Sequence, residues 1–337
     1  MLPDSFIFLP HNETIKQLIQ NHYTININSS TSLGGHSNLT FKIIDTENAT
    51  CILRLSKPAK NSKDLEREEY ILNSLEDLGY TKAPQIVKTI ENKGHLILNL
   101  KDQSYSLQIF NFIPGEVKYK WHDKSEEEDL KPIFNELAIL HTKLQQIPNS
   151  TAFPEQKFEY NLNLFSESIL VKQPTGTYLL KHHSIFVHNA KKIMNEIEIL
   201  LIKYPQNQYI HGDIHLENII FNCNNVTAIL DFEYACYGNI VVDIIFSAFR
   251  ICKYGLQDDH LYYDVEGIKI GLTTYSLANK KYSFILQQFM ENEKLWKAFF
   301  ALDQAFLYIN KAASGIWQLQ EKIGFLPCFN EVIKYEK

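Results

Sequence analysis

The chain has 337 residues, of which 45% are hydrophobic and 21% are charged, and its formal net charge is −6. This composition is typical of a globular protein, and the acidic balance gives no electrostatic drive toward nucleic acid or an anionic membrane. No apolar run reaches the roughly 18 residues of a membrane span. Residues 1–10 lack a basic leader and the five cysteines form no C-x-x-C pair, so we expect free thiols and a cytoplasmic location.

The first third of the sequence is predicted to form mostly strands. Apolar residues alternate along it with the period of two that is typical of half-buried strands, and short polar turns separate the runs. The expected elements are a helix over 13–22 capped by Asn12, a hairpin of strands 39–43 and 50–56, a helix over 63–78, and strands 95–100 and 105–113.

The pattern changes to helical spacing after Pro114-Gly115. We therefore predict an α+β fold with two lobes: residues 1–112 form an antiparallel-sheet lobe with one helix, and residues 113–337 form a larger, mainly helical lobe. The hinge is expected near residues 111–115. The elements expected in the second lobe are a helix that starts at a Ser125-x-x-Glu128 capping box and runs to Pro148, helices over 185–204, 240–254 and 293–318, and short strands that bracket 209–232.

The segment from His211 to Asn218 carries the strongest chemical pattern. It places a carboxylate, Asp213, and an amide, Asn218, five residues apart, and a predicted β-hairpin follows that ends at a second carboxylate, Asp231. Because a hairpin brings its two ends together, Asn218 and Asp231 should lie side by side. Oxygen ligands of this kind suit Mg²⁺. Asp213 would then be free to accept a proton from a hydroxyl, as phosphoryl transfer requires.

These residues resemble the protein-kinase catalytic loop H-R-D-x-x-x-x-N, except that Gly212 replaces its arginine. With Asp231-Phe232-Glu233 they are more similar to the aminoglycoside phosphotransferase and choline kinase family, and closest to its homoserine-kinase-like branch. The resemblance implies a protein-kinase-like fold, ATP and Mg²⁺ as cofactors, Asp213 as the catalytic residue, and Asn218 and Asp231 as metal ligands. It also implies that His211 packs and hydrogen-bonds, and that Asp243 ties down the loop backbone.

The family's phosphate-covering loop corresponds to a small, glycine-containing stretch between two predicted strands. Glycine lets backbone N–H groups approach phosphate closely, although a plain hairpin turn would also use two glycines. His215 takes the place of a lysine near the γ-phosphate, and a plain loop role fits it equally well. By analogy, backbone near residues 110–113 would bind adenine. The candidate nucleotide-binding residues from these comparisons are Gly34, Gly35, His36, Ser37, Asn38, Asn111, Phe112, Ile113 and His215.

Arg54 occupies the strand position where most relatives have a lysine, and its fork of donors suits phosphate oxygens. A surface arginine is the alternative. Glu68 is its expected partner, because it lies three residues after Leu65 and four before Leu72 on the inward helix face. A carboxylate there is costly unless it is paired. Both residues are therefore assigned to the nucleotide site.

The phosphate acceptor is the least defined part of the sequence. The resemblance implies a small-molecule alcohol, either a homoserine- or choline-like metabolite or an aminoglycoside. A protein serine/threonine kinase is a second hypothesis, which the missing A-P-E-like segment opposes, and a nucleotide-binding scaffold is a third. The sequence does not indicate the oligomeric state. Aromatic residues that are either acceptor-pocket or core residues are Tyr234, Tyr237, Trp296, Tyr308 and Trp317.

Overall fold

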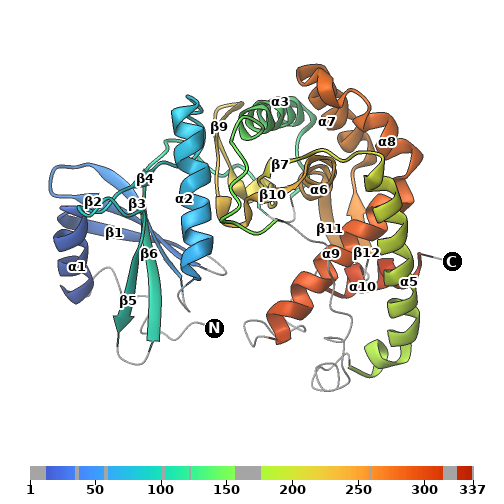
Figure 1. The fold of residues 1–337 in the computed structure, drawn as a ribbon, viewed down its shortest axis with the longest axis horizontal. Coiled ribbons are helices and arrows are strands. Elements are labelled where there is room, and N and C mark those ends of the chain that lie inside the picture. The colour runs from blue at the N-terminus through green and yellow to red at the C-terminus, as the bar shows by residue number, and fades with distance from the viewer. Residues whose placement is uncertain are drawn as a thin grey trace.

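Two lobes lie side by side in the computed structural model, with helix α2 (Ser62–Asp77) between them (Figure 1). The structure describes residues 13–34, 38–56, 60–100, 103–120, 123–155, 176–257, 260–313 and 325–335. The smaller lobe is built on an antiparallel sheet and the larger one is mainly helical. The predicted α+β, two-lobed fold is thus confirmed.

The sheet of the smaller lobe has the strand order β1-β2-β3-β6-β4, and β5 pairs with β6. Helix α1 (Glu13–Tyr23) packs on the sheet through Ile15 and Ile19, which are fully buried against β2 and β3 residues such as Phe41 and Leu53. This apolar contact fixes β3, the strand that carries Arg54. The strands are β1 (Ile27–Gly34), β2 (Asn38–Asp45), β3 (Thr50–Ser56), β4 (Ile86–Val87), β5 (Leu96–Leu100) and β6 (Gln103–Asn111).

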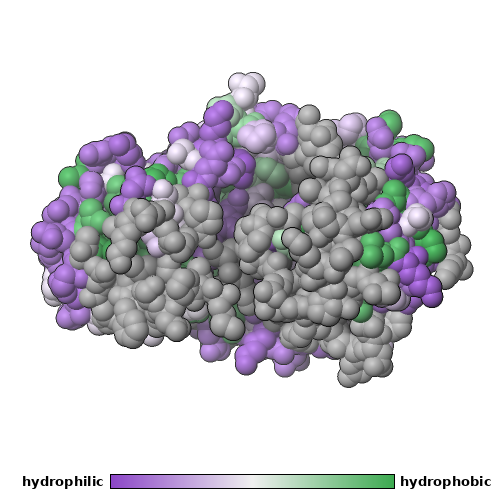
Figure 2. Space-filling view, turned by 90° about the horizontal axis from the view of Figure 1, so that it is seen from below, coloured by the Kyte–Doolittle hydropathy of each residue, from purple (hydrophilic) through white to green (hydrophobic). Residues whose placement is uncertain are grey.

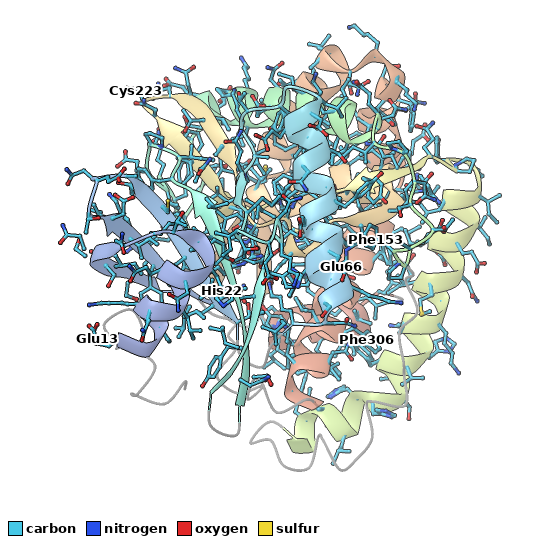
Figure 3. All side chains as sticks on the ribbon, turned by 60° about the vertical axis from the view of Figure 1, so that its left-hand side comes forward. Glu13, His22, Glu66, Phe153, Cys223 and Phe306 are labelled. Carbon is cyan, nitrogen blue, oxygen red and sulfur yellow. The ribbon has the colours of Figure 1, made fainter. Side chains whose placement is uncertain are left out.

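Helix α2 packs on the core of the helical lobe. The Asn61 side chain caps its start by accepting a hydrogen bond from Lys63 N. Its buried residues Ile71, Leu72 and Leu75 belong to the large core of the helical lobe. In Figure 3 the helix, marked by Glu66, stands between the sheet and the helical lobe. One face of α2 is therefore set by the second lobe, which fixes the position of Glu68 on the same helix.

Helix α6 is the centre of the larger lobe, and ten of its side chains besides Asp243 are buried. Three two-stranded antiparallel sheets, β7–β10, β8–β9 and β11–β12, adjoin it and carry the loops of chemical interest. The helices are α3 (Glu127–Leu144), α5 (Gly176–Ile202), α6 (Ile240–Ile251), α7 (Val265–Ala278), α8 (Ile285–Glu291), α9 (Glu293–Ala313) and α10 (Phe325–Ile333). The strands are β7 (Asn207–Ile210), β8 (Ile219–Asn222), β9 (Asn225–Ile229), β10 (Cys236–Asn239), β11 (Lys253–Gln257) and β12 (His260–Tyr263).

Two local predictions were wrong. The capping box at Ser125 does not form, because the Ser125 hydroxyl donates to the Ile251 carbonyl at 3.4 Å and Glu126 is the N-cap residue without a side-chain bond. The helix predicted over 240–254 ends at Ile251, because the chain turns into strand β11 at Lys253 and pairs with β12. In both places a tertiary partner, absent from the local pattern, decides the structure.

The described surface is mostly hydrophilic in the view of Figure 2, with hydrophobic residues in small groups. Within the described residues, no helix combines the length and apolar character needed to cross a membrane. All five cysteines are free thiols, and the exposed Cys223 lies at the β8–β9 turn, at the edge of the molecule (Figure 3).

Candidate active site

One buried carboxylate, Asp243, holds the backbone of the loop that follows β7. The N–H groups of His211 and Gly212 each donate a hydrogen bond to its carboxylate at 3.0 Å. Burial alone would raise the pKa of Asp243, but the hydrogen bond from His141 and its charge lower that pKa below its usual value. Asp243 therefore ties down the loop as an ionised group, as the family resemblance implied.

His211 is a buried, neutral histidine in a defined tautomer. Its Nε2 lies 2.9 Å from the Leu230 carbonyl, which only accepts, so Nε2 carries the proton. Its Nδ1 then accepts from Asp213 N at 3.3 Å. Burial lowers the pKa of His211 to about 4, and the ring packs against Phe232 at a centroid distance of 4.5 Å. His211 thus connects the loop to the hairpin that ends at Asp231.

Asp213 projects from this loop with its side chain 27% exposed. Arg250 Nε lies 3.5 Å from its Oδ1, and His215 Nε2 lies 3.8 Å from its Oδ2. Burial lowers the pKa of His215, so this ring is neutral at pH 7. Because Asp213 is partly exposed, a bound hydroxyl can reach its carboxylate, which can accept the hydroxyl proton.

The hairpin β8–β9 brings Asn218 next to the segment that ends at Asp231. Ile219 pairs with Ile229, and Leu230 N donates to the Asn218 carbonyl at 2.7 Å. The Asn218 side chain donates from Nδ2 to the Asp213 carbonyl at 3.0 Å. This bond fixes the amide and leaves its oxygen as the atom that could coordinate a cation.

Asp231 has a left-handed backbone with φ of 65°, which is strained for a residue other than glycine. Arg54 Nη1 approaches its Oδ1 at 3.4 Å. Burial, together with the charge of Glu233, raises the pKa of Asp231 to about 7. The charges of Glu68 and Asp213 act in the same direction. A buried carboxylate with other carboxylates nearby is stabilised in its ionised form by an additional cation at this position.

The oxygen atoms of Asp231 and Asn218 suit a hard divalent ion such as Mg²⁺. Among the described residues, no group of three or more His, Cys, Asp or Glu side chains is arranged to hold a metal. Mg²⁺ does not need one, because it is usually held by one or two protein oxygens together with phosphate oxygens and water. The Asp231 carboxylate and the Asn218 amide oxygen supply that number.

Arg54 and Glu68 form a buried ion pair, as predicted from the spacing of Glu68 on its helix. Arg54 is 8% exposed and Glu68 is 2% exposed. Arg54 Nη2 also donates to Gln108 Oε1 at 2.6 Å, and the guanidinium lies 4.9 Å from the Phe110 ring. These contacts hold the guanidinium in one orientation, with Nη1 directed toward Asp231.

A polar seam joins the two lobes at Glu233. Its carboxylate accepts a hydrogen bond from Asn38 Nδ2 at 2.8 Å and forms an ion pair with Lys60. Arg67 Nη2 donates to the Glu233 carbonyl at 3.2 Å. The seam connects the start of β2 to the residue two after Asp231. Gly34 ends β1 with φ of 82°, whereas the candidates Gly35, His36 and Ser37 lie outside the described residues.

The segment between the lobes begins where the β3–β6 ladder ends, at the pair Cys51 and Asn111. Asn111 is anchored to Gln85 through its backbone and side-chain amides, each at 2.9 Å. Phe112 and Ile113 follow as half-buried residues beyond the last ladder pair. A few residues further on, Glu116 pairs through its backbone with Phe221 of β8, so this segment leads directly to the β8–β9 hairpin.

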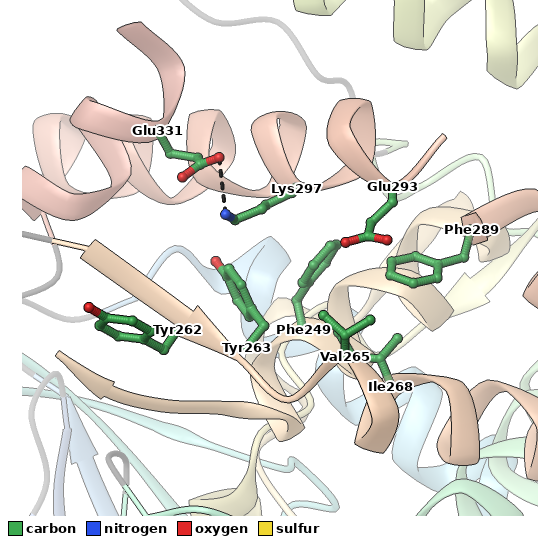
Figure 4. A pocket seen from close by; sticks show the side chains of 9 residues that line it. All are labelled: Phe249, Tyr262, Tyr263, Val265, Ile268, Phe289, Glu293, Lys297 and Glu331. Atoms are coloured by element: carbon green, nitrogen blue, oxygen red, sulfur yellow. Dashed lines mark ion pairs between the residues drawn. The ribbon is translucent and has the colours of Figure 1, made fainter. Parts of the chain in front are cut away.

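A cavity of about 370 Å³ lies between β12 and helices α7, α8, α9 and α10 (Figure 4). Lys297 crosses it and pairs with Glu331 at 3.2 Å. Two of the aromatic candidates, Trp296 and Tyr308, are buried core residues instead, and Trp317 lies outside the described residues. The cavity is lined by Phe249, Tyr262, Tyr263, Val265, Ile268, Phe289, Glu293, Lys297 and Glu331.

Arg250 and Lys60 contact the site but were missed from the sequence. Arg250 follows Asp213 by 37 positions on an apolar helix, and no spacing rule connects the two residues. Lys60 lies in a polar stretch before α2 that resembles an ordinary solvated loop. The sequence does show that Glu233 replaces the glycine of D-F-G. A search for a cation to pair with this glutamate could have pointed to Lys60.

A sequence profile described as the phosphotransferase enzyme family matches residues 31–259. This range includes the sheet, the loop with Asp213 and the hairpin that ends at Asp231. No curated protein sequence is similar enough to the chain to match it.

Solved structures share the fold at low sequence identity. An amicoumacin kinase is 13% identical with a TM-score of 0.66, and the alignment covers 96% of this chain and 94% of that one. An ethanolamine kinase from Plasmodium vivax is 18% identical with a TM-score of 0.59, and the alignment covers 95% of this chain and 89% of that one. A choline kinase from Cryptosporidium parvum is 14% identical with a TM-score of 0.56, covering 91% and 88%. The chain therefore has the fold of these kinases.

Proposed function

Because the chain belongs to the phosphotransferase enzyme family, we propose that it is an ATP-dependent, Mg²⁺-assisted kinase that phosphorylates a hydroxyl group of a small molecule. The observation that carries the proposal is the convergence of Asp213, Asn218, Asp231 and Arg54 at the junction of the two lobes. These are the groups that phosphoryl transfer needs: a proton acceptor, oxygen ligands for a cation and a fixed cation for phosphate.

In this proposal Asp213 orients the acceptor hydroxyl and takes its proton. Arg54, held by Glu68, binds phosphate oxygens of the nucleotide. Asn218 and Asp231 would hold Mg²⁺, and the chemistry that this ion supplies when bound is neutralisation of negative charge on the phosphoryl oxygens. His215 lies beside Asp213 and would contact the phosphate or the acceptor.

The nucleotide would lie between the lobes. We propose that the boundary falls at residues 112–113, just after β6 ends, and that Asn111, Phe112 and Ile113 contact adenine. The phosphate-covering stretch would be Gly34, Gly35, His36, Ser37 and Asn38. The similar amicoumacin kinase was solved with AMP-PNP and Ca²⁺, which supports nucleotide binding in this fold. The free cysteines support a reducing, cytoplasmic location.

The acceptor class is proposed from the chemistry of similar folds. Similar folds belong to kinases named for choline, ethanolamine and amicoumacin, which supports an amino-alcohol-type metabolite, homoserine- or choline-like, or an aminoglycoside. A protein substrate is the competing function, and a non-catalytic nucleotide-binding scaffold is the other.

An ATP-consumption screen with Mg²⁺ tests the proposal, using homoserine, choline, ethanolamine, sugars and aminoglycosides as acceptors. Asp213→Asn should reduce turnover by about 10²–10⁴-fold while ADP binding, measured by calorimetry, stays unchanged. Asp77→Asn, which removes an exposed carboxylate at the end of α2, is the matched control and should keep full activity. If the wild-type protein does not bind ADP, the proposed kinase function is refuted. Nucleotide binding without small-molecule turnover would favour a protein substrate or a scaffold.

A further inference from the structure

Two buried cations, Arg250 and Lys253, lie beside Asp213 outside the proposed nucleotide site. Arg250 is in the last turn of α6, and Lys253 begins β11 directly after that helix. Arg250 Nε is 3.5 Å from Asp213 Oδ1, and the Lys253 residue is 8% exposed. Glu217 is the other carboxylate whose charge reaches Lys253. Arg250 is thus paired with Asp213 directly, and the charges of Asp213 and Glu217 both act on Lys253.

The guanidinium of Arg250 is held in place with part of its hydrogen-bonding capacity unused. Its carbon lies 5.7 Å from the Phe246 ring and 5.6 Å from the Phe300 ring, and the side chain is 10% exposed. Nε faces Asp213, whereas Nη1 is buried without a hydrogen-bond partner among the described residues. A buried donor without an acceptor is costly, so the site favours a ligand that supplies one.

From this arrangement, and resting on the proposed kinase function, we infer that the acceptor carries an anionic group, a carboxylate or a phosphate, near the hydroxyl that Asp213 activates. Arg250 binds this group, and Lys253 adds a second positive charge. The planar guanidinium fork matches the geometry of both anions.

The same charges act against cationic acceptors. An ammonium group placed beside Asp213 would face Arg250 and Lys253, and like charges in a desolvated site discriminate strongly. Burial lowers the pKa of Lys253 to about 8, which leaves it mostly protonated at pH 7. Lys253 is also the register partner of Tyr263, which lines the 370 Å³ cavity, so space for the rest of an acceptor adjoins the cations. Choline and aminoglycosides are therefore the less suitable candidates.

Matched acceptor pairs test the inference, because each pair differs only in its anionic group. L-homoserine is compared with homoserinol for a carboxylate, and glycerol 3-phosphate with glycerol for a phosphate. Hydroxy acids, phosphorylated alcohols, sugars, choline and aminoglycosides extend the panel by charge class. The measured quantities are kcat and KM for acceptor-dependent ATP consumption, and binding of each probe by calorimetry with and without ADP. We expect the anionic class to give the highest kcat/KM, and the pair that responds identifies carboxylate or phosphate.

Arg250→Gln should raise the KM of the best anionic acceptor by about 10-fold or more, because a charge-assisted hydrogen bond is lost. Arg250→Lys should restore part of that loss. If Arg250 only positions Asp213, the variant would lower kcat equally for both members of a pair and leave their kcat/KM ratio unchanged, which would overturn the inference. Lys269→Gln removes a partly exposed positive charge, paired with Glu266, from α7 of the same lobe and serves as the charge control.

Two results separate failure of this inference from failure of the proposed function. If ADP binds but an acceptor without an anionic group is preferred, or if no probe with an anionic group binds better than its counterpart without one, the inference alone is overturned. If ADP does not bind either, the kinase function fails and the inference fails with it.

Discussion

Replacing the buried ion pair of Arg54 and Glu68 should separate its role in stability from its role in nucleotide binding. Because the two residues are 8% and 2% exposed, Glu68→Leu leaves the Arg54 charge buried with only Gln108 and a weaker contact to Asp231. Removing one partner of such a pair typically costs about 3–5 kcal/mol of unfolding free energy. Arg54→Met should cost a similar amount.

The double variant removes both charges and replaces them with apolar groups of similar size, so it should be more stable than either single variant. A double-mutant cycle, measured by urea unfolding followed by circular dichroism, should give a coupling energy of at least about 2 kcal/mol. The double variant should nevertheless lose ADP binding in calorimetry, because Arg54 is absent. The exposed pair Lys93 and Glu91 is the control and should couple by less than about 1 kcal/mol. Additive costs for Arg54 and Glu68, or normal ADP binding by the double variant, would refute this reasoning.

Three further predictions concern the loop that holds Asp213. Gly212→Ala should cost about 1–3 kcal/mol in urea unfolding, because φ is 81° and a Cβ would lie 2.8 Å from the Tyr234 carbonyl; an unchanged unfolding midpoint would contradict this. His211 has a folded pKa of about 4, below its unfolded value, so the unfolded state binds the extra proton and stability falls as pH drops from about 6.5 to 4. Wild type should lose about 2 kcal/mol more than His211→Asn between pH 7.5 and 5, and parallel pH profiles would exclude this. Asp243→Ala leaves two loop N–H groups unsatisfied and should cost about 2–6 kcal/mol, with Asp243→Asn costing less; equal stability of the two variants in urea would argue against the anchoring role.

The parts of this fold that could be predicted from sequence are those set by local periodicity or by a short loop. The β2–β3 hairpin follows from alternation around one turn, and Glu68 follows from its place between Leu65 and Leu72. The proximity of Asn218 and Asp231 follows from a hairpin only a few residues long. In each case the sequence separation is small, so few arrangements compete.

The rest depends on partners that are distant in sequence. The bond between Asn38 and Glu233 spans 195 positions, and Arg250 reaches Asp213 only because α6 packs at the centre of the lobe. Lys253 follows a run with good helical spacing, yet pairing with β12 makes it a strand residue. Tertiary contacts override local preference at these positions, and a single sequence carries no signal of them.

The seam at Glu233 also constrains how related chains can diverge. Its carboxylate is the shared acceptor for Asn38 and Lys60, so a lineage that replaces it with glycine leaves both donors without that partner. Substitutions at the three positions are then no longer independent: each alters the cost of the next. Among chains that keep this glutamate, hydrogen-bond donors should be retained at positions 38 and 60, and where the glutamate is absent this constraint on both positions is lost. Asn38, Lys60 and Glu233 are thus expected to change together during evolution, although they lie near opposite ends of the range 31–259 that matches the family.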